Sequence, residues 1–477
     1  MKLRQLFITA ICVFTFNSCD SFLEVDEVGK SSIPLFFSDM NGVRAAIPGA
    51  YSSVYAYYDF GYTLYPDVAG DMLRLNIVGG DTKMVSEYNY NATPEDEITP
   101  VGRIWRDGYE ALANVNNIIE YYPKLVEKFP QNANELAQIK AEALFLRGLI
   151  HFDLVKVYAQ PFNFTPDASH PGIPVLVKTP GPDTNVGRNT VSETYTQIIK
   201  DLEDSAELFE TGIEIGDGSV YHVSKLAVYS LLSRVSLYME NWSDAANYAT
   251  LVINETELSQ GQDYLKIFNT IGASDESIFS LSGKLKKSTV GTFYNINNPT
   301  GFADVKLVNL LNENPDDIRL QLLKETPGQQ TTPTLKYYKP GIPEGELQHD
   351  ILVIRASEMY LIRAEANVNM GQLEHAKNDL KAIQARAQQR EVSEIEIAEN
   401  GASALQKLIW DEKAKEFCFE GHRLFDLTRT KQGVVRDNSN TSNVKEVQYP
   451  NFRFALPIPQ TELNANKNIL QNSGYEQ

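Results

Sequence analysis

Apolar residues recur at intervals of three and four along most of the chain, which is the spacing of one helix face. One such face follows Pro100 and comprises Trp105, Tyr109, Leu112, Val115 and Ile119. The same spacing predicts further helices over about 39–58, 134–159, 192–210 and 403–420. Ser192 is a suitable N-cap residue with Glu193 in the first turn, so we expect the third of these helices to begin there.

Two pairs of predicted helices are joined by very short turns. One pair covers about 222–239 and 243–254, and the other covers about 356–370 and 373–388. Small residues lie where the helices of a pair would pack closely: Ala245, Ala246, Ala364, Ala366 and Ala376. Tetratricopeptide units, with a period of roughly 34 residues, have this arrangement. The pattern therefore predicts a mainly all-α fold with tetratricopeptide-like helix pairs.

Helical periodicity is interrupted by three segments rich in Gly, Pro and polar residues, at about 75–98, 160–190 and 255–350. The last of these contains two short strand-like runs, Ser277–Leu281 and Leu335–Tyr338.

The first residues have the features of an export signal. Lys2 and Arg4 precede an uncharged, mainly apolar run over residues 6–16. This run is too short for a bilayer span, which needs roughly 20 apolar residues, but it has the length of a secretory signal. Cys19 follows a small residue directly, as in bacterial lipoprotein signals. We predict a signal peptide over 1–18, a lipid on Cys19 and a tether over 19–40; an ordinary signal with an incidental Cys is the alternative.

Composition narrows the class of protein further. The formal net charge of -19 argues against nucleic acid and against anionic lipid headgroups as partners. Cys12 lies in the signal and Cys19 is the predicted lipid site, so only Cys418 remains and no intramolecular disulfide is possible. The hydrophobic core must therefore stabilise the chain.

No catalytic or metal-binding motif is recognisable. No two of the six His lie three or four apart, and the sequence has no nucleophile elbow, no dinucleotide fingerprint and no phosphate-binding loop. We predict no enzyme activity, no metal and no cofactor. Glu416 and Glu420 lie four apart, and an anchored all-helical glycosidase would need two carboxylates facing a cleft, roughly 5 to 9.5 Å apart. We favour an ion-pair network with Arg423 and Lys413.

A series of short motifs runs through the chain in order. Phe22, Leu23 and Glu24 follow Cys19 closely, and RGLIHFDLV begins at Arg147. The second half contains an alanine-rich helix over 354–366, an EGxR motif over 420–423, a DLxR motif over 426–429 and the C-terminal FALPIP over 454–459. Together these motifs resemble the SusD/RagB family of Bacteroidetes surface lipoproteins.

The resemblance implies a single body in which tetratricopeptide-like pairs pack against an irregular, loop-rich segment, with a SusD-like N-terminal part over 41–254 and a C-terminal part over 255–477. It also implies a protein anchored in the outer membrane by its lipid and facing outward. Such a protein would bind a glycan and deliver it to a SusC-like TonB-dependent β-barrel transporter, without covalent chemistry. A peptide-binding lid of the same kind of complex is the alternative.

The family motifs have mainly structural roles by this resemblance. Buried charges need partners, so we expect them to tie helices together; the residues are Arg147, Glu420, Gly421, Arg423, Asp426 and Arg429.

Two loops offer the aromatic and polar groups that a sugar requires. We predict ligand contacts from Asp71, Arg74, Tyr88, Tyr90, Asn91, Phe293, Tyr294 and Asn295. The alternation of Tyr and Asn over 88–91 is equally consistent with a strand that has one wet face.

Overall fold

The computed structural model describes residues 33–77, 84–181, 184–210, 219–269, 274–284, 286–324, 331–339 and 348–476. The chain divides into two compact units, residues 1–45 and 46–477. In the first unit, α2 (Ile33–Phe36) precedes the start of α3 (Met40–Tyr57), and the Asp39 carboxylate caps α3 by accepting from the backbone N–H groups of Asn41 and Gly42. The predicted signal over 1–18 and Cys19 lie outside the described residues.

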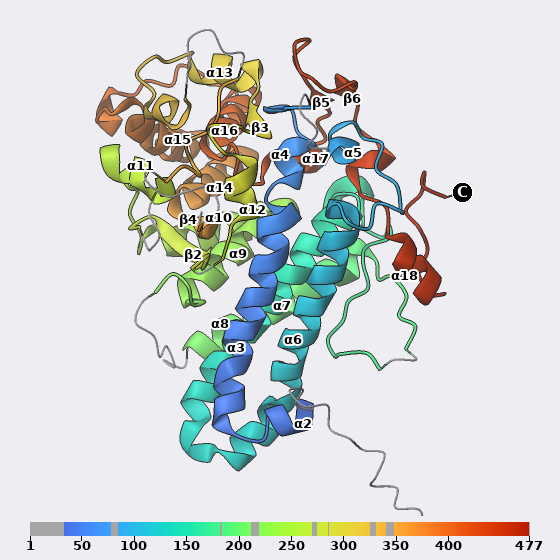
Figure 1. The fold of residues 1–477 in the computed structure, drawn as a ribbon. Coiled ribbons are helices and arrows are strands. Elements are labelled where there is room, and N and C mark those ends of the chain that lie inside the picture. The colour runs from blue at the N-terminus through green and yellow to red at the C-terminus, as the bar shows by residue number, and fades with distance from the viewer. Residues whose placement is uncertain are drawn as a thin grey trace, which may run out of the picture. The chain divides into compact units, whose positions relative to one another are not determined.

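The second unit is built around a row of long helices in which each helix packs on the next (Figure 1). They are α6 (Pro100–Lys128), α7 (Ala133–Tyr158), α8 (Val191–Glu210), α9 (Lys225–Tyr238), α10 (Trp242–Ile253), α14 (Ala356–Asn369), α15 (Leu373–Gln388) and α16 (Ala402–Glu416). The mainly all-α fold predicted from the periodicity is confirmed. The boundary at residue 254 between an N-terminal and a C-terminal part stays a prediction.

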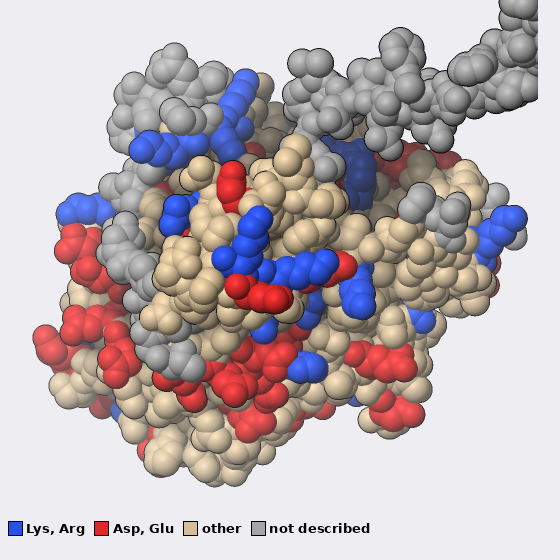
Figure 2. All heavy atoms as spheres, turned by 90° about the horizontal axis from the view of Figure 1, so that it is seen from below, with Lys and Arg blue, Asp and Glu red and all other residues tan. Residues whose placement is uncertain are grey.

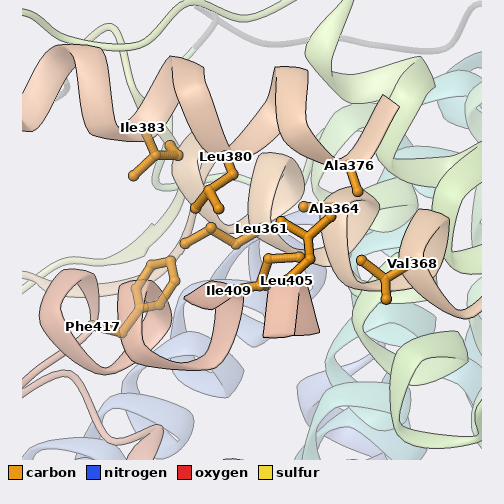
Figure 3. Close-up of a cluster of buried hydrophobic side chains, with 9 residues drawn as sticks. All are labelled: Leu361, Ala364, Val368, Ala376, Leu380, Ile383, Leu405, Ile409 and Phe417. Atoms are coloured by element: carbon orange, nitrogen blue, oxygen red, sulfur yellow. The ribbon is translucent and has the colours of Figure 1, made fainter. Parts of the chain in front are cut away.

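Both predicted helix pairs are present, as α9 with α10 and α14 with α15. The second pair closes on α16 around a buried apolar cluster (Figure 3). The cluster comprises Leu361, Ala364, Val368, Ala376, Leu380, Ile383, Leu405, Ile409 and Phe417. Small Ala364 and Ala376 face each other where α14 and α15 approach, as the sequence pattern predicted.

The start of α8 differs from the prediction by two residues. Thr190, not Ser192, forms the cap: its hydroxyl accepts from the Glu193 N–H at 3.1 Å, and the Glu193 carboxylate accepts from the Thr190 N–H at 2.9 Å. This reciprocal pair is a capping box. Both residues have a capping side chain, but only Thr190 has an acid three positions later.

Short elements connect the long helices. The helical ones are η2 (Tyr58–Tyr62), α4 (Tyr65–Val68), α5 (Val85–Tyr88), η3 (Pro130–Asn132), η4 (Phe162–Phe164), α11 (Gly261–Asn269), α12 (Thr289–Phe293), α13 (Val305–Leu311), η5 (Ile318–Leu322), η7 (Val392–Glu394), α17 (Arg423–Arg429), η8 (Phe452–Phe454) and α18 (Gln460–Ala465). The strands form antiparallel pairs: β1 (Leu73–Leu75) with β3 (Gly301–Ala303), β2 (Ser277–Leu281) with β4 (Ile351–Arg355), and β5 (Val434–Val435) with β6 (Glu446–Val447). The strand predicted over Ser277–Leu281 is confirmed, whereas Leu335–Tyr338 is a turn.

Buried ion pairs connect segments that are distant in sequence. Arg355, at the end of β4, binds Glu276 at 2.8 Å, Glu416 at 2.5 Å and Glu420 at 3.0 Å. Arg386 joins the same group by contacting Glu276 and Glu416. Glu416 and Glu420 are thus part of an ion-pair network. The partners of Glu420 are Arg355 and Lys336, whereas we expected Arg423.

The other family motifs also hold partners from distant elements. Arg147 on α7 pairs with Asp201 on α8 at 2.6 Å, and Arg423 pairs with Asp71 at 2.6 Å. Arg429 contacts Asp426 in its own helix and Glu365 on α14: the Arg429–Asp426 distance is 2.7 Å and the Arg429–Glu365 distance is 2.8 Å.

Gly421 has a positive φ of 81°, and a Cβ there would lie 2.9 Å from the Thr63 carbonyl oxygen, so the turn after α16 requires glycine.

Charge is unevenly placed on the face shown in Figure 2, where acidic side chains gather in one broad area and basic side chains form a band beside it. None of the described helices is both long and apolar enough to cross a membrane.

Candidate ligand-binding site

A cavity of about 140 Å³ opens where the end of α3, the start of α6 and the short helix α12 converge. Its lining residues come from five separate stretches of the chain: Phe60, Leu64, Met84, Ile98, Thr99, Pro100, Thr289, Thr292, Phe293 and Thr300.

The first wall is a π-helical turn, η2, that extends α3. Such turns are rare and frequently occur at functional sites. Here Tyr58 and Tyr62 are buried, while Phe60 is half-buried and lines the cavity. The same turn carries Asp59, whose carboxylate accepts from the Ser288 hydroxyl and the Thr289 N–H, each at 2.7 Å. Asp59 therefore holds the start of α12, and with it the two threonines of that helix, against η2.

The second wall is the beginning of α6. Thr99 is the N-cap and Pro100 occupies the first helical position, where a missing N–H costs nothing. Thr99 donates its hydroxyl hydrogen to the Asp96 carbonyl at 3.1 Å. Ile98 precedes the cap with a side chain that is 82% exposed, so an apolar surface leads into the cavity.

Two phenyl rings from distant parts of the sequence, Phe60 and Phe293, line the cavity. The Arg103 guanidinium lies 3.9 Å from the centroid of the Phe60 ring, a cation–π distance, and also contacts Asp107 at 3.3 Å. Phe293 is 5% exposed and packs against Gly301, where a Cβ would approach the ring to 2.2 Å. Gly301 is thus required for the position of the Phe293 ring.

The cavity is uncharged, because its lining contains no acidic or basic residue among those that the structure describes. Its polar groups are the hydroxyls of four threonines. Thr292 donates to the Ser288 carbonyl at 2.8 Å and so keeps its lone pairs as acceptors. Hydroxyl acceptors beside apolar rings suit a neutral ligand that has both C–H faces and hydroxyl groups.

Two predicted ligand residues, Asp71 and Arg74, are instead packed into the structure. Asp71 is 1% exposed and pairs with Arg423 and Lys306. Burial raises the pKa of this carboxyl, but the two cations outweigh it and hold the pKa below its usual range. Arg74 places its guanidinium over the Phe302 ring at 5.5 Å. Neither lines the cavity.

The Tyr and Asn residues over 88–91 form the end of α5 and a turn, so the strand alternative is wrong. Tyr88 is fully buried and donates its hydroxyl to Asn440, and Tyr90 is 5% exposed and donates to the Ala69 carbonyl. Neither ring lines the cavity, so in this structure the two tyrosines do not form part of it. Asn91 is exposed but does not line the cavity.

The second predicted loop lies closer to the cavity. Phe293 lines it, as described above. Tyr294 is 1% exposed and stacks on Tyr337 with a centroid distance of 5.1 Å, and Asn295 accepts from the Asn297 N–H at 2.8 Å. Of the eight predicted ligand residues, Phe293 alone belongs to the lining that the described part of the chain provides; its contact with a ligand stays a prediction.

Sequence reasoning did not single out Phe60, Thr99, Thr289 and Thr292. Only Thr99 had a local signal, since a Thr-Pro pair marks a helix start. The threonines of α12 and Phe60 lie more than two hundred positions apart, so no spacing rule connects them.

No group of three or more His, Cys, Asp or Glu side chains within the described ranges could hold a metal ion. Glu416 and Glu420 do not face the cavity: burial raises the pKa of Glu416, but Arg386, Arg355 and Arg319 outweigh it and keep its pKa well below the usual range.

Two family models match the chain. One, described as starch-binding and associating with the outer membrane, matches residues 22–237, and the SusD family model matches residues 324–475. Together they cover more than half of the chain.

Individual proteins give the same result. SusD-like protein P25 of Formosa agariphila is 22% identical over 560 residues, covering 100% of both chains. The starch-binding protein SusD of Bacteroides thetaiotaomicron is 33% identical over 133 residues, which are 27% of this chain and 22% of that one.

A crystal structure of a putative sugar binding protein from Bacteroides vulgatus is 26% identical, covers 92% of this chain and 99% of its own, and has a TM-score of 0.79. The resemblance first seen in the short motifs is confirmed: the chain belongs to the SusD/RagB family of starch- and glycan-binding proteins that associate with the outer membrane.

Proposed function

We propose that this protein captures a neutral glycan in the cavity between η2, α6 and α12, and delivers it to a SusC-like TonB-dependent β-barrel transporter. The observation that carries the proposal is the lining itself, in which two phenyl rings and four threonine hydroxyls surround a space without charge. Sugar rings have apolar C–H faces and hydroxyl edges, and this combination satisfies both.

The family supports the same ligand class. One matching model is described as starch-binding, and the structural relative from Bacteroides vulgatus is named a putative sugar binding protein. An uncharged cavity offers no ion pair to the charged ends of a peptide, so the peptide-binding alternative lacks a matching group at this site.

Binding without covalent chemistry fits the position of the acidic residues. A retaining or inverting glycosidase needs two carboxylates beside the sugar. The pair considered for that role, Glu416 and Glu420, is buried in salt bridges with arginine and lysine. We therefore propose capture and transfer, with the chain held at the outer membrane by a lipid on Cys19 and facing outward.

Titration calorimetry of the purified full-length protein tests the proposal. The ligands are neutral oligosaccharides of α-1,4-glucan, β-1,3-glucan, mannan and xylan, with release of reducing sugar assayed in parallel. For a ligand that binds, we expect Phe60→Ala to weaken affinity roughly 5- to 10-fold, corresponding to the ~1–1.5 kcal/mol of an aromatic contact. Phe164→Ala, which removes an exposed ring that does not line this cavity, should leave the affinity unchanged.

A second variant pair isolates the hydroxyl. Thr292→Val removes a hydroxyl at the cavity, and Thr196→Val removes one from an exposed site on α8 that makes the same hydrogen bond to the carbonyl four residues earlier. Only the first should weaken binding. Sugar release would contradict the binding-only function. Equal affinities for Phe60→Ala and the unchanged protein, or no binding of any of the four glycans, would contradict the assignment of this cavity to a neutral glycan.

A further inference from the structure

A second cavity, of about 340 Å³, lies between the loop that follows α7 and the C-terminal segment. In Figure 1 the green loop after α7 runs beside the red C-terminal part of the chain. Its lining shares no residue with the cavity described above. We infer that this second cavity binds a sugar that carries a negative charge, as a carboxylate or a sulfate.

Two exposed phenyl rings line the cavity. Phe164 is 41% exposed and Phe452 is 37% exposed, so both present apolar surface to solvent at the same opening. Large apolar groups exposed together at a concave site mark a binding surface more often than a structural one. Aromatic faces of this kind match the C–H faces of sugar rings.

Hydrogen bonds hold the two ring-bearing segments in place. The Gln160 side chain donates to the backbone carbonyls of Asn451 and Phe452 at 3.0 and 3.2 Å. The ring of His170 lies between the Gln160 carbonyl and the Thr165 hydroxyl, at 3.1 and 2.9 Å. Both rings therefore project from segments that are fixed before any ligand arrives.

The charge of the cavity comes from Arg188. Among the described residues its guanidinium donates to backbone carbonyls alone: Gly172 at 2.7 Å, Leu470 at 3.1 Å, Pro171 at 3.2 Å and Tyr158 at 3.4 Å. Backbone carbonyls are neutral, so they orient the guanidinium but do not neutralise its positive charge.

No carboxylate compensates that charge. None lies within salt-bridge distance of Arg188, and none lines the cavity, in the parts of the chain that the structure describes. Burial lowers the pKa of Arg188 to about 10, which shows that its charge is poorly solvated yet present at neutral pH. Asp167, in the loop that carries Phe164, is fully exposed and interacts with His170.

Comparison with the buried arginines shows why this arrangement is distinctive. Arg147, Arg234 and Arg355 each contact a carboxylate. Arg436 is also surrounded by carbonyls, but it is 4% exposed and enclosed beneath the Tyr88 ring, so that no ligand reaches it. Arg188, in contrast, lines an open cavity together with two exposed rings. Arg188 is half-buried, and a partly desolvated charge without a carboxylate partner gains from an incoming anion.

The class of ligand follows from the two features together. The rings select a flat partner with apolar faces, and Arg188 selects an anionic group on it. A neutral sugar would leave the charge of Arg188 uncompensated, and a free anion would leave the rings exposed. The positive charge of this cavity is also opposite in sign to the net charge of the protein, which is -19.

The test compares three tetrasaccharides by titration calorimetry on the full-length protein. They are tetragalacturonic acid, a sulfated carrageenan tetrasaccharide and neutral maltotetraose. We expect at least one acidic tetrasaccharide to bind at least ten times more tightly to this cavity than maltotetraose does, and to weaken as salt is raised. Which of the two acids binds identifies the charged group.

Variants separate this site from the first cavity. Phe164→Ala and Phe452→Ala, both at exposed positions, should each weaken acidic-sugar binding at least fivefold, and Arg188→Gln should abolish it. Phe60→Ala should leave it unchanged. Arg188 also donates to four backbone carbonyls, so Arg188→Gln is interpreted only if its melting temperature is close to that of the unchanged protein. If Arg188→Gln is destabilised, the two ring variants alone test the inference.

Three results would overturn the inference: no binding of either acidic sugar, equal binding of maltotetraose that Phe60→Ala leaves unchanged, or acidic-sugar binding that both ring variants retain. A failure of the neutral-glycan proposal leaves these results unaffected, since that proposal depends on Phe60 and this one on Phe164 and Phe452.

Discussion

Replacing Arg355 by methionine should destabilise the protein more than any comparable change at its surface. The Arg355 guanidinium makes five hydrogen bonds. Two go to the Glu420 carboxylate, one to the Glu416 carboxylate, one to the Glu416 backbone carbonyl and one to the Glu276 carboxylate. Methionine keeps the apolar stem but leaves three buried carboxylates short of positive charge.

The remaining cations limit the loss. Glu416 keeps Arg386 at 2.6 Å and Arg319 at 3.1 Å, and Glu420 keeps Lys336 at 2.6 Å. Removing one partner of a buried ion pair typically costs ~3–5 kcal/mol. Unfolding entropy scales at ~2.1 cal/mol/K per residue, or roughly 1 kcal/mol/K for this length, so we expect the melting temperature to fall by about 3–5 °C.

Differential scanning calorimetry at pH 7 measures this change. Lys200→Met is the control, because it breaks an exposed pair with Asp204 at 2.7 Å, and such pairs contribute ~0–1 kcal/mol. The pKa of Glu416 is lowered in the folded state, so the stability it provides is present above its unfolded pKa and is lost as pH falls through the folded value. The difference between Arg355→Met and the unchanged protein should therefore shrink below about pH 4. A decrease of less than about 1 °C at pH 7, or an equal decrease in the control, would refute the reasoning.

Three further changes have defined outcomes. Burial raises the pKa of Asp67 to about 7, although the hydrogen bond from the Gly421 N–H at 2.9 Å opposes this shift. Ionisation of Asp67 in the folded state therefore lowers stability as pH rises from about 4 to 7. Asp67→Asn should raise the melting temperature at about pH 8 and lose that advantage near about pH 4. Gly421→Ala should lower the melting temperature by about 1–3 °C, since it forces a side chain into φ +81° against the Thr63 carbonyl, and an unchanged value would contradict this. Gly301→Ala should displace Phe293 and weaken neutral-glycan binding several-fold in calorimetry, whereas retention of full affinity would exclude the ring from the site.

The helices were predictable because their signal is local. The apolar spacing that marks α9, α10, α14 and α15 depends on neighbours three and four positions away, and each helix begins and ends within a few residues of its prediction. Errors concentrated at ends and short elements. Thr190, not Ser192, is the cap of α8, and the strand-like run Leu335–Tyr338 is a turn.

The aromatic loops show what composition alone leaves undecided. Tyr88 and Tyr294 have the composition of a sugar platform, but composition does not reveal whether another segment covers a ring. Here Asn440 and Arg436 lie against Tyr88, and Tyr337 stacks on Tyr294. Burial of a ring is a property of the segments that pack on it, and these lie hundreds of positions away in one case and tens in the other.

The sequence by itself determined the helical class, the tetratricopeptide-like pairs and the family, because periodicity and motif order are readable along the chain. The tertiary structure alone decided which residues form the two cavities and which cations neutralise Glu416. Phe60 and Thr289 line one cavity, and Arg188 and Phe452 line the other, only because the folded chain brings together segments more than two hundred positions apart. No local spacing rule predicts that these residues lie close together, since their proximity results from the packing of the whole core.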